Sequence, residues 1–523
     1  MYFYLRYTYV LVYTSMCGIF ACITNEFMID YMRENGFMCR HRGPDSSVEY
    51  KSHAHGQDIF FLFHRLAING LDEGSNQPFE QQDVVLMCNG EIYNYKELAK
   101  VYSCTLRTHS DCEIIIHLYR LLGIQMISLL DGVFSFVLYD RLSQIVYVGH
   151  DPLGIRSLYM STDNGLFVSS ELKCLQNFKK HVELVEPGVY HSYDLLHKRA
   201  DKTVYYTLCH RSLYKSDDIC ISMIRKLLGE SVQKRLLSDR PIGCLLSGGL
   251  DSSIIAGIMC TYRKPELVKT FSIGLEGSPD LEAAQLVADH LGTNHTSVVV
   301  SEKSMLSAIR ETIKQIESYD TTTVRASVPM YLLAKYIKEY TDITVVLSGE
   351  GADELSGSYL YFHKAPGPKE FQRECERLVR DVQHYDVLRC DKTTAGNSLE
   401  VRVPFFDKTF VKEYMNIDPA LKMVREQDTC HHEKYLLRKA FEKELPESIV
   451  WRRKEGFSDG VSSLQKPWYQ IVNEYTHTIH NCSEKEYYKS LFREYYPRYE
   501  YICPYEWLPK WVERANPSGR LIL

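Results

Sequence analysis

From Cys17 to about Thr207 the chain alternates short apolar runs with turns. Four runs are rich in β-branched and aromatic residues and end at Gly, Asn or Asp; they cover 58–63, 83–87, 132–138 and 144–148. Runs of this length are typical of strands and too short for most helices. We therefore predict that the first half is rich in sheet.

Beyond a polar linker near 205–217, the spacing of apolar residues changes from that of strands to that of helices. Apolar positions from Ile221 to Leu236 recur every three or four residues, which predicts one buried helical face. Strand and helix signals then alternate; we expect strands over 242–246, 270–273 and 343–347, and helices from Ser252, over 283–291 and over 328–340. This alternation predicts a parallel sheet with crossover helices, an α/β domain after an α+β one. The last ~70 residues show no clear pattern.

Residues 1–16 differ from both halves. They are apolar and rich in tyrosine, with one basic residue, no clean run long enough to span a bilayer and no signal-peptide pattern. We expect residues 1–16 to be an upstream extension with Met16 as the working start, followed by domains at 17–207 and 208–523.

Composition narrows the function classes. A chain of 523 residues, 45% hydrophobic and 24% charged, is typical of a soluble globular protein with two domains. A net charge of -6 without a basic arm makes nucleic acid an unexpected partner, and no membrane partner is expected either. Sixteen cysteines without a CxxC pair indicate thiols in a reducing compartment, so we expect a cytoplasmic protein.

Two short segments carry candidate chemistry. Cys17 follows Met16, and a cysteine freed by methionine removal has its own α-amine, titrating near ~8, as the base that activates the thiol. Ser247–Ser253 (SGGLDSS) follows an apolar strand and opens a helix, whose free N–H groups favour an anion. It lacks the lysine of a Walker A loop.

The surrounding motifs resemble two known families. Segments 40–45, 64–66, 88–94 and 110–111 resemble the class II glutamine amidotransferases, which are N-terminal-nucleophile hydrolases with an αββα sandwich. Segments 247–253, 319–330, 348–354, 400–405 and 451–460 resemble the glutamine-hydrolysing asparagine synthetases, whose second domain is a PP-loop ATP pyrophosphatase with a parallel sheet. The resemblance spans nearly all of 17 to about 465.

The resemblance implies roles in a glutaminase site where Cys17 is the nucleophile. Arg65 would hold the α-carboxylate of glutamine, and Glu91 and Asp111 would hold its α-ammonium. Asn89, with the N–H of Gly90, would form the oxyanion hole.

The resemblance also implies ATP-dependent synthesis of asparagine from aspartate and glutamine through β-aspartyl-AMP, with ATP and Mg²⁺ as cofactors. The nucleotide would contact Leu246, Ser247, Gly248, Gly249, Asp251, Ser252, Ile273, Ser348 and Gly349. Asp251 and Asp353 would hold Mg²⁺. Lys454 would neutralise charge on the α-phosphate, and Glu350 would act as a base toward ammonia.

Some residues depart from the pattern or suggest other sites. Ser358 stands where the family more often has glycine, and Gly456 where glutamine is common. His431 and His432 are adjacent, so on a helix they would point in different directions; we predict a surface pair rather than a metal site.

Alternatives remain open at this stage. One is a related amidotransferase or β-lactam-type synthetase that adenylates another carboxylate. Another is a catalytically silent interaction protein, which the intact Cys17, Arg65, Asp251, Glu350 and Lys454 argue against. The expected partners are glutamine, aspartate and ATP, and a homodimer is left open.

Overall fold

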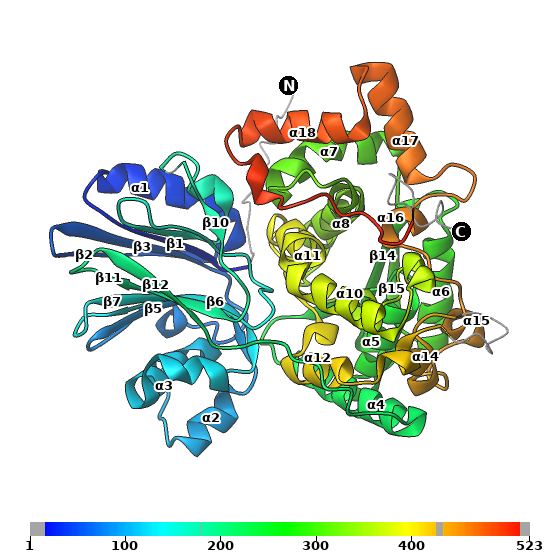
Figure 1. Ribbon diagram of the computed structural model, residues 1–523, viewed down its shortest axis with the longest axis horizontal. Coiled ribbons are helices and arrows are strands. Elements are labelled where there is room, and N and C mark those ends of the chain that lie inside the picture. Colours follow the sequence, from blue (N-terminus) through cyan, green and yellow to red (C-terminus); the bar gives the residue numbers. More distant parts are fainter. Residues whose placement is uncertain (1–15, 179, 425–431, 513–523) are drawn as a thin grey trace, which may run out of the picture.

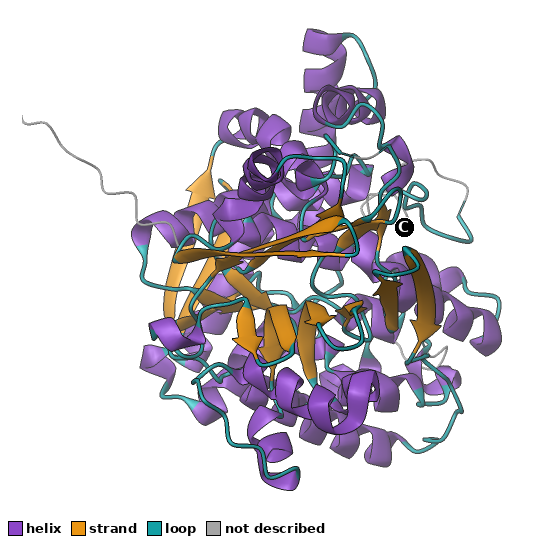
Figure 2. Ribbon diagram, turned by 90° about the vertical axis from the view of Figure 1, so that its left-hand side faces the viewer, coloured by secondary structure: helices purple, strands orange, loops and turns teal. Residues whose placement is uncertain are grey.

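The computed structural model describes residues 16–178, 180–424 and 432–512. Two halves lie side by side, an N-terminal half of stacked sheets and a larger C-terminal half built mainly of helices around one sheet (Figure 1). Figure 2 shows the strands (orange) as layers between helices (purple).

The N-terminal half is a sandwich of two six-stranded antiparallel sheets. The first has the order β10-β8-β9-β1-β3-β2 and the second β12-β11-β7-β6-β5-β4. The first contains β1 (Gly18–Thr24), β2 (Ser46–Ala54), β3 (Gln57–Arg65), β8 (Tyr159–Ser161), β9 (Leu166–Ser169) and β10 (Glu183–Leu184). The second contains β4 (Phe79–Gln81), β5 (Val84–Ile92), β6 (Gly132–Asp140), β7 (Ile145–His150), β11 (Val189–Asp194) and β12 (Arg199–Val204).

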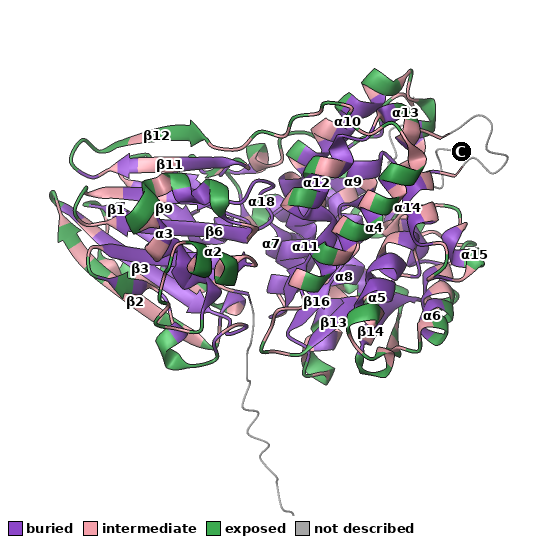
Figure 3. Ribbon diagram, turned by 90° about the horizontal axis from the view of Figure 1, so that it is seen from below, coloured by how far each residue is buried: buried purple, intermediate pink, exposed green. Residues whose placement is uncertain are grey.

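Alternation along β1 explains why both of its faces are buried. Ile19, Ala21 and Ile23 pack between the two sheets, whereas Phe20 and Cys22 join the cluster on the outer face. Only β12 is largely exposed, at the edge of the second sheet, as Figure 3 shows in green. Its charged side chains protect that edge from pairing with another chain.

Helices cover the outer faces of the sandwich, α1 (Ile29–Gly36) on the first sheet and α2 (Tyr95–Val101) with α3 (Ile114–Leu122) on the second (Figure 1). The helical stretch Asp111–Leu129 is long and apolar enough to cross a bilayer by length and composition. Ile114, Ile115 and Ile116 of this stretch are buried in the cluster that includes Leu86 and Phe136 of the second sheet. The sandwich with helices on both outer faces is the predicted αββα arrangement.

The C-terminal half is built on a five-stranded parallel sheet of order β15-β14-β13-β16-β17, as the alternation predicted. Its strands are β13 (Ile242–Leu245), β14 (Lys269–Leu275), β15 (Asn294–Val300), β16 (Val345–Leu347) and β17 (Glu400–Arg402). The chain leaves β13 toward β14 and later returns to β16 on the other side. The carboxyl end of β13 therefore lies at a topological switch point, where α/β sheets bind ligands.

The larger helices of this half cover the sheet and extend beyond it. They are α4 (Asp217–Lys234), α5 (Leu250–Tyr262), α6 (Pro279–Leu291), α7 (Glu302–Ile316), α8 (Thr321–Tyr340), α10 (Pro368–Asp381), α11 (Asp386–Ala395), α12 (Lys408–Met415), α17 (Trp468–Tyr475) and α18 (Glu484–Tyr495). The shorter ones are α9 (Ala352–Ser356), α13 (Pro419–Lys422), α14 (Tyr435–Ala440), α15 (Glu447–Val450) and α16 (Phe457–Gly460).

Helix α8 begins seven residues before the predicted start at Val328, at Thr321. Asp320 caps it by accepting from the N–H of Thr323 at 2.9 Å. Pro329 lies inside the helix, a position that ordinarily ends one. Buried packing of nearly the whole first half of α8 compensates for the lost hydrogen bond.

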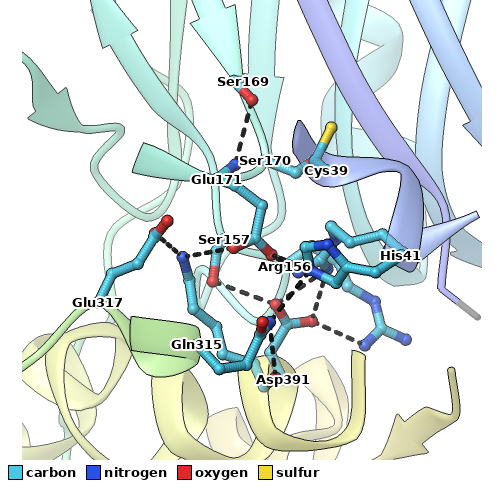
Figure 4. A network of polar contacts seen from close by, with 12 residues as sticks. Cys39, His41, Arg156, Ser157, Ser169, Ser170, Glu171, Gln315, Glu317 and Asp391 are labelled. Carbon is cyan, nitrogen blue, oxygen red and sulfur yellow. Dashed lines mark hydrogen bonds and ion pairs between the residues drawn. The ribbon is translucent and has the colours of Figure 1, made fainter. Parts of the chain in front are cut away.

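A buried ionic network joins the two halves (Figure 4). The Arg42 guanidinium lies 2.6 Å from Glu171 and 3.0 Å from Asp391, which belongs to α11. Lys392, the next residue, lies 3.4 Å from Glu171 and also pairs with Glu317. All five side chains are almost fully buried. Each charge therefore depends on its partners, because an unpaired charge at such a site is strongly destabilising.

Candidate functional site

Cys17 lies directly before β1, an interior strand of the first sheet. The β1–β3 register pairs Gly18 with His64, so Cys17 is brought opposite the end of β3. Its Sγ accepts from the N–H of Leu66 at 3.3 Å and faces the carbonyl of Leu66 at 3.6 Å. The thiol is thus held by backbone groups.

The environment of Cys17 opposes ionisation. Burial raises the pKa of the Cys17 thiol to about 12, and the hydrogen bond to the Leu66 backbone and the charge of Arg65 oppose this only in part. A thiol with this pKa is ionised to about one part in 10⁵ at pH 7. A nucleophilic role therefore requires a base next to the sulfur.

Asn89 and Gly90 lie on β5, which packs against β1 from the second sheet. The side-chain amide nitrogen of Asn89 is buried and has no hydrogen-bond partner among the described residues. Gly90 has φ +152°, and a Cβ there would lie 2.0 Å from the carbonyl oxygen of Val133. The strand therefore holds an unused donor, as an oxyanion hole requires.

Arg65 ends β3, and its guanidinium is turned into the loop that follows. It donates to the carbonyls of Asn69 and Asp72 at 3.3 and 3.0 Å, to the side chain of Asn76 at 2.9 Å, and to the carbonyl of Gly70. These bonds fix the direction of the guanidinium. Its predicted contact with a substrate carboxylate stays a prediction.

Glu91 and Asp111 are both buried near this site. Asp111 accepts from the N–H of Ile92 at 2.6 Å, and burial raises its pKa to about 6. Burial and the charges of Asp111 and Glu400 raise the pKa of Glu91 well above its ordinary value. The C-terminal half supplies a counter-charge, because Arg402 lies 3.4 Å from Glu91.

The Ser247 loop joins β13 to α5 at the switch point. Ser247 Oγ accepts from the N–H of Gly249 at 3.3 Å, and Ser252 Oγ accepts from the N–H of Ser247 at 3.2 Å. Gly248 has φ +71°, and a Cβ there would lie 2.4 Å from the nitrogen of Ala284. The loop is compact because no side chain larger than hydrogen fits at Gly248.

A pocket opens above this loop at the carboxyl ends of β13, β14 and β16. Most of the residues predicted to contact the nucleotide line it, but Gly248 does not. The predicted lining residues are Leu246, Ser247, Gly249, Asp251, Ser252, Ile273, Ser348, Gly349, Glu350, Asp353 and Lys454. The structure therefore brings segments separated by about two hundred positions into one pocket, an arrangement typical of a nucleotide site.

Ion pairs dominate the floor of the pocket. Lys434 lies 2.6 Å from both Asp251 and Asp353, and Lys454 lies 2.6 Å from Asp353. The two lysines hold the pKa of Asp353 well below its usual range despite burial. Asp353 in turn raises the pKa of Lys454, although burial opposes this.

Glu350 lies on one wall beside Arg389, which contacts Glu350 at 2.5 Å and Asp386 at 2.7 Å. Burial raises the pKa of Glu350 to about 7, and Arg389 limits the rise. A carboxyl group with this pKa can accept or release a proton near neutrality.

The acids of the pocket suit Mg²⁺ in their donor chemistry. Asp251 Oδ1 is buried and has no partner among the described residues, so a hard acceptor is free there. Ser358, the departure noted above, donates to Asp353 at 2.5 Å. The substituted hydroxyl thus contacts a predicted metal ligand directly.

Several residues of this pocket were not predicted from the sequence, notably Lys434, Arg389 and Asp386. Lys434 follows the proposed histidine pair, in a segment whose pattern gave no sign of burial. His431 lies outside the described residues; His432 is half-buried with its ring 5.3 Å from that of Trp451. The described part of the chain contains no group of three or more His, Cys, Asp or Glu placed to hold a metal ion.

Known proteins match both halves. A family model described as "Asparagine synthase" matches residues 223–370 and 365–512, and one described as "Glutamine amidotransferase domain" matches 16–211. The asparagine synthetases [glutamine-hydrolyzing] of Gallus gallus and Homo sapiens are each 38% identical to this chain, over 97% of the chain and 98% of the relative. A solved glutamine phosphoribosylpyrophosphate amidotransferase from B. subtilis superposes with a TM-score of 0.31 at 15% identity over 64% of this chain and 81% of that one.

Proposed function

This chain belongs to the glutamine-hydrolysing asparagine synthetases, and from that premise we propose that it makes L-asparagine from L-aspartate, L-glutamine and ATP. The observation that carries the proposal is the pocket at the switch point. There the Ser247 loop, which suits an anion, faces Glu350, Asp353 and Lys454.

In the proposed reaction the β-carboxylate of aspartate attacks the α-phosphorus of ATP, giving β-aspartyl-AMP and pyrophosphate. Lys454 offsets the negative charge that grows on the phosphate. Ammonia then attacks the acyl carbon, Glu350 accepts a proton and AMP leaves. Asp251 and Asp353 would hold Mg²⁺, which when bound would neutralise phosphate charge.

We propose that Cys17 attacks the glutamine amide in a form whose first residue is Cys17. The raised pKa of the thiol supports this, because a free α-amine would supply the base that the described surroundings of the sulfur do not provide. Asn89 Nδ2 and the N–H of Gly90 would stabilise the oxyanion. Collapse of the tetrahedral intermediate expels ammonia for the second pocket and leaves a γ-glutamyl thioester on Cys17. Water then hydrolyses this thioester to glutamate and the free thiol.

We also propose a cytoplasmic location. Its support is that the described cysteines carry no disulfide.

Isotope transfer tests the proposed chemistry. With ¹⁸O in the β-carboxylate of aspartate and ¹⁵N in the glutamine amide, we expect one ¹⁸O in AMP and ¹⁵N in asparagine. AMP without ¹⁸O would contradict the adenylate route. Pyrophosphate release with another carboxylic acid, and none with aspartate, would favour a synthetase that adenylates a different substrate.

A further inference from the structure

The loop that follows β3 determines where Arg65 points. Loop 66–72 begins at Leu66, whose backbone N–H and carbonyl both contact the Cys17 sulfur. It continues through Asn69 to Asp72, whose carbonyls accept from the Arg65 guanidinium. A shift of residues 67–72 would therefore move the proposed carboxylate-binding group, while Leu66 holds the sulfur of Cys17.

Asp239 and Arg240 of the C-terminal half, between α4 and β13, hold this loop at three points. The backbone N–H of Asp239 donates to the carbonyl of Ile68 at 3.0 Å. Its carboxylate accepts from the N–H of Gly70 at 2.9 Å, and Arg240 Nε donates to the carbonyl of Ala67 at 2.9 Å. The contacts fall on residues 67, 68 and 70, which are on either side of Asn69 and at Gly70, two of the residues whose carbonyls accept from Arg65.

The contacts extend on both sides of the loop. Asp45 accepts from the N–H of Ala67 at 2.9 Å and lies 3.6 Å from Arg240, so both polar groups of the Ala67 backbone are held. On the other side, Asp239 lines a surface hollow together with Gly70 and Asp72. Gly70 has φ +67°, a conformation in which a side chain is strained. The bond from its N–H to Asp239 therefore holds the loop at a residue whose backbone conformation favours glycine.

We infer that Asp239 and Arg240 are positioning residues for glutamine hydrolysis, supplied by the half of the molecule that binds ATP. They hold loop 66–72 so that Arg65 stays directed for the substrate carboxylate. The inference rests on the proposed function, because it takes glutamine as the ligand of that site.

The test uses the full chain in its glutaminase-active form and the variants Asp239→Ala, Asp239→Asn and Arg240→Ala. Each alanine variant is expected to raise the KM for glutamine by about five- to tenfold, the effect of losing one partly exposed hydrogen bond to a charged group. The kcat of glutamate release and the rate of ammonia-dependent synthesis stay near wild type. Asp239→Asn also stays near wild type, because its amide oxygen accepts the same bond from Gly70.

Asp342→Ala is the matched control, since this exposed carboxylate lies just before β16 and pairs with Lys269 at 2.5 Å. An unchanged KM in both alanine variants would overturn the inference, as would equal loss of glutamine- and ammonia-dependent activity, which indicates a purely structural role. Glutamate release reports on the inference, and asparagine formation by wild type with ammonia reports separately on the proposed function.

Discussion

The two proposed reaction sites of this protein are built on opposite physical principles. The glutaminase site lies between antiparallel sheets, where backbone groups hold Cys17 and where Asn89 keeps a donor unused. The synthetase pocket lies at the ends of parallel strands, where lysines pair with Asp251 and Asp353. In the first site the sulfur itself contacts neutral backbone groups, whereas the acidic groups of the second are paired directly with lysines.

The difference teaches what each site must do when substrate arrives. An unused donor in a rigid strand can stabilise charge without reorganising. In the pocket, the lysine charges already have partners, so a polyphosphate must compete with Asp251 and Asp353 for Lys434 and Lys454. We therefore expect the glutaminase site to change little on binding and the synthetase pocket to exchange ion pairs.

The largest expected effect separates the two sites completely. Cys17→Ala removes the proposed nucleophile, so glutamine-dependent asparagine synthesis should fall by at least about 10⁴-fold. Ammonia-dependent synthesis should stay near wild type, because that reaction bypasses the thiol. Both rates are measured as asparagine formed, with the exposed Cys209→Ala as control. Substantial glutamine use by the variant would show that another group attacks the amide.

Lys454→Met should act on the charged pocket alone. Loss of one cation at the developing phosphate charge should lower synthesis from either nitrogen donor by about 10²- to 10³-fold. Glutamate release without ATP should be unaffected. Lys439→Met is the control, since Lys439 pairs with Glu442 at 2.9 Å. A defect restricted to glutamine-dependent synthesis would refute the assignment.

Asn89→Ala probes the unused donor. The kcat for glutamine hydrolysis should fall by about 10²-fold with little change in KM, because the donor acts on the oxyanion and not on the bound amide. Ser135→Ala is a matched control, because Ser135 lies opposite Asn89 on β6 and its hydroxyl also lacks a partner among the described groups. A rise in the KM for glutamine of about 10²-fold without a fall in kcat would instead assign Asn89 to the binding of glutamine.

The smallest effect is a pH dependence of the charged pocket. With hydroxylamine as the nitrogen donor, kcat should fall about tenfold for each pH unit below 7, because Glu350 accepts protons only when ionised. The Glu350→Gln variant should have a low kcat that does not fall further below pH 7. The raised pKa also means that Glu350 destabilises the fold as pH rises from about 4.5 through 7. If kcat of Glu350→Gln still fell as the pH was lowered below 7, a group other than Glu350 would be the base.

The strands of the core could be predicted from the sequence because one-sided or complete burial leaves a pattern of apolar residues. Prediction located β3 and β13 to within a few residues. It missed β15, an edge strand whose exposed and half-buried residues alternate without a clear apolar face. It also started α8 too late, because Pro329 ordinarily begins or ends a helix.

The same contrast applies to the sites. Asp251 and Glu350 stand in short motifs whose local geometry is encoded by neighbouring residues. Lys434 reaches Asp251 across 183 positions and Arg389 reaches Glu350 across 39. Such contacts depend on how distant elements pack, and no periodicity in the sequence reports them.

Strand β13 lies between the residues that hold loop 66–72 and the Ser247 loop of the second pocket. Only Pro241 separates Arg240 from β13, and only Leu246 separates its far end from Ser247. The extended segment 241–246, which lies between the residues that hold loop 66–72 and the Ser247 loop, is about 20 Å long at ~3.3 Å per residue. If ATP binding alters glutamine affinity through this strand, thermodynamic reciprocity requires glutamine to alter ATP affinity by the same factor. Equilibrium titration of the Cys17→Ala protein, which should not hydrolyse glutamine, with ATP and with glutamine, each in the presence and absence of the other, would measure that factor twice.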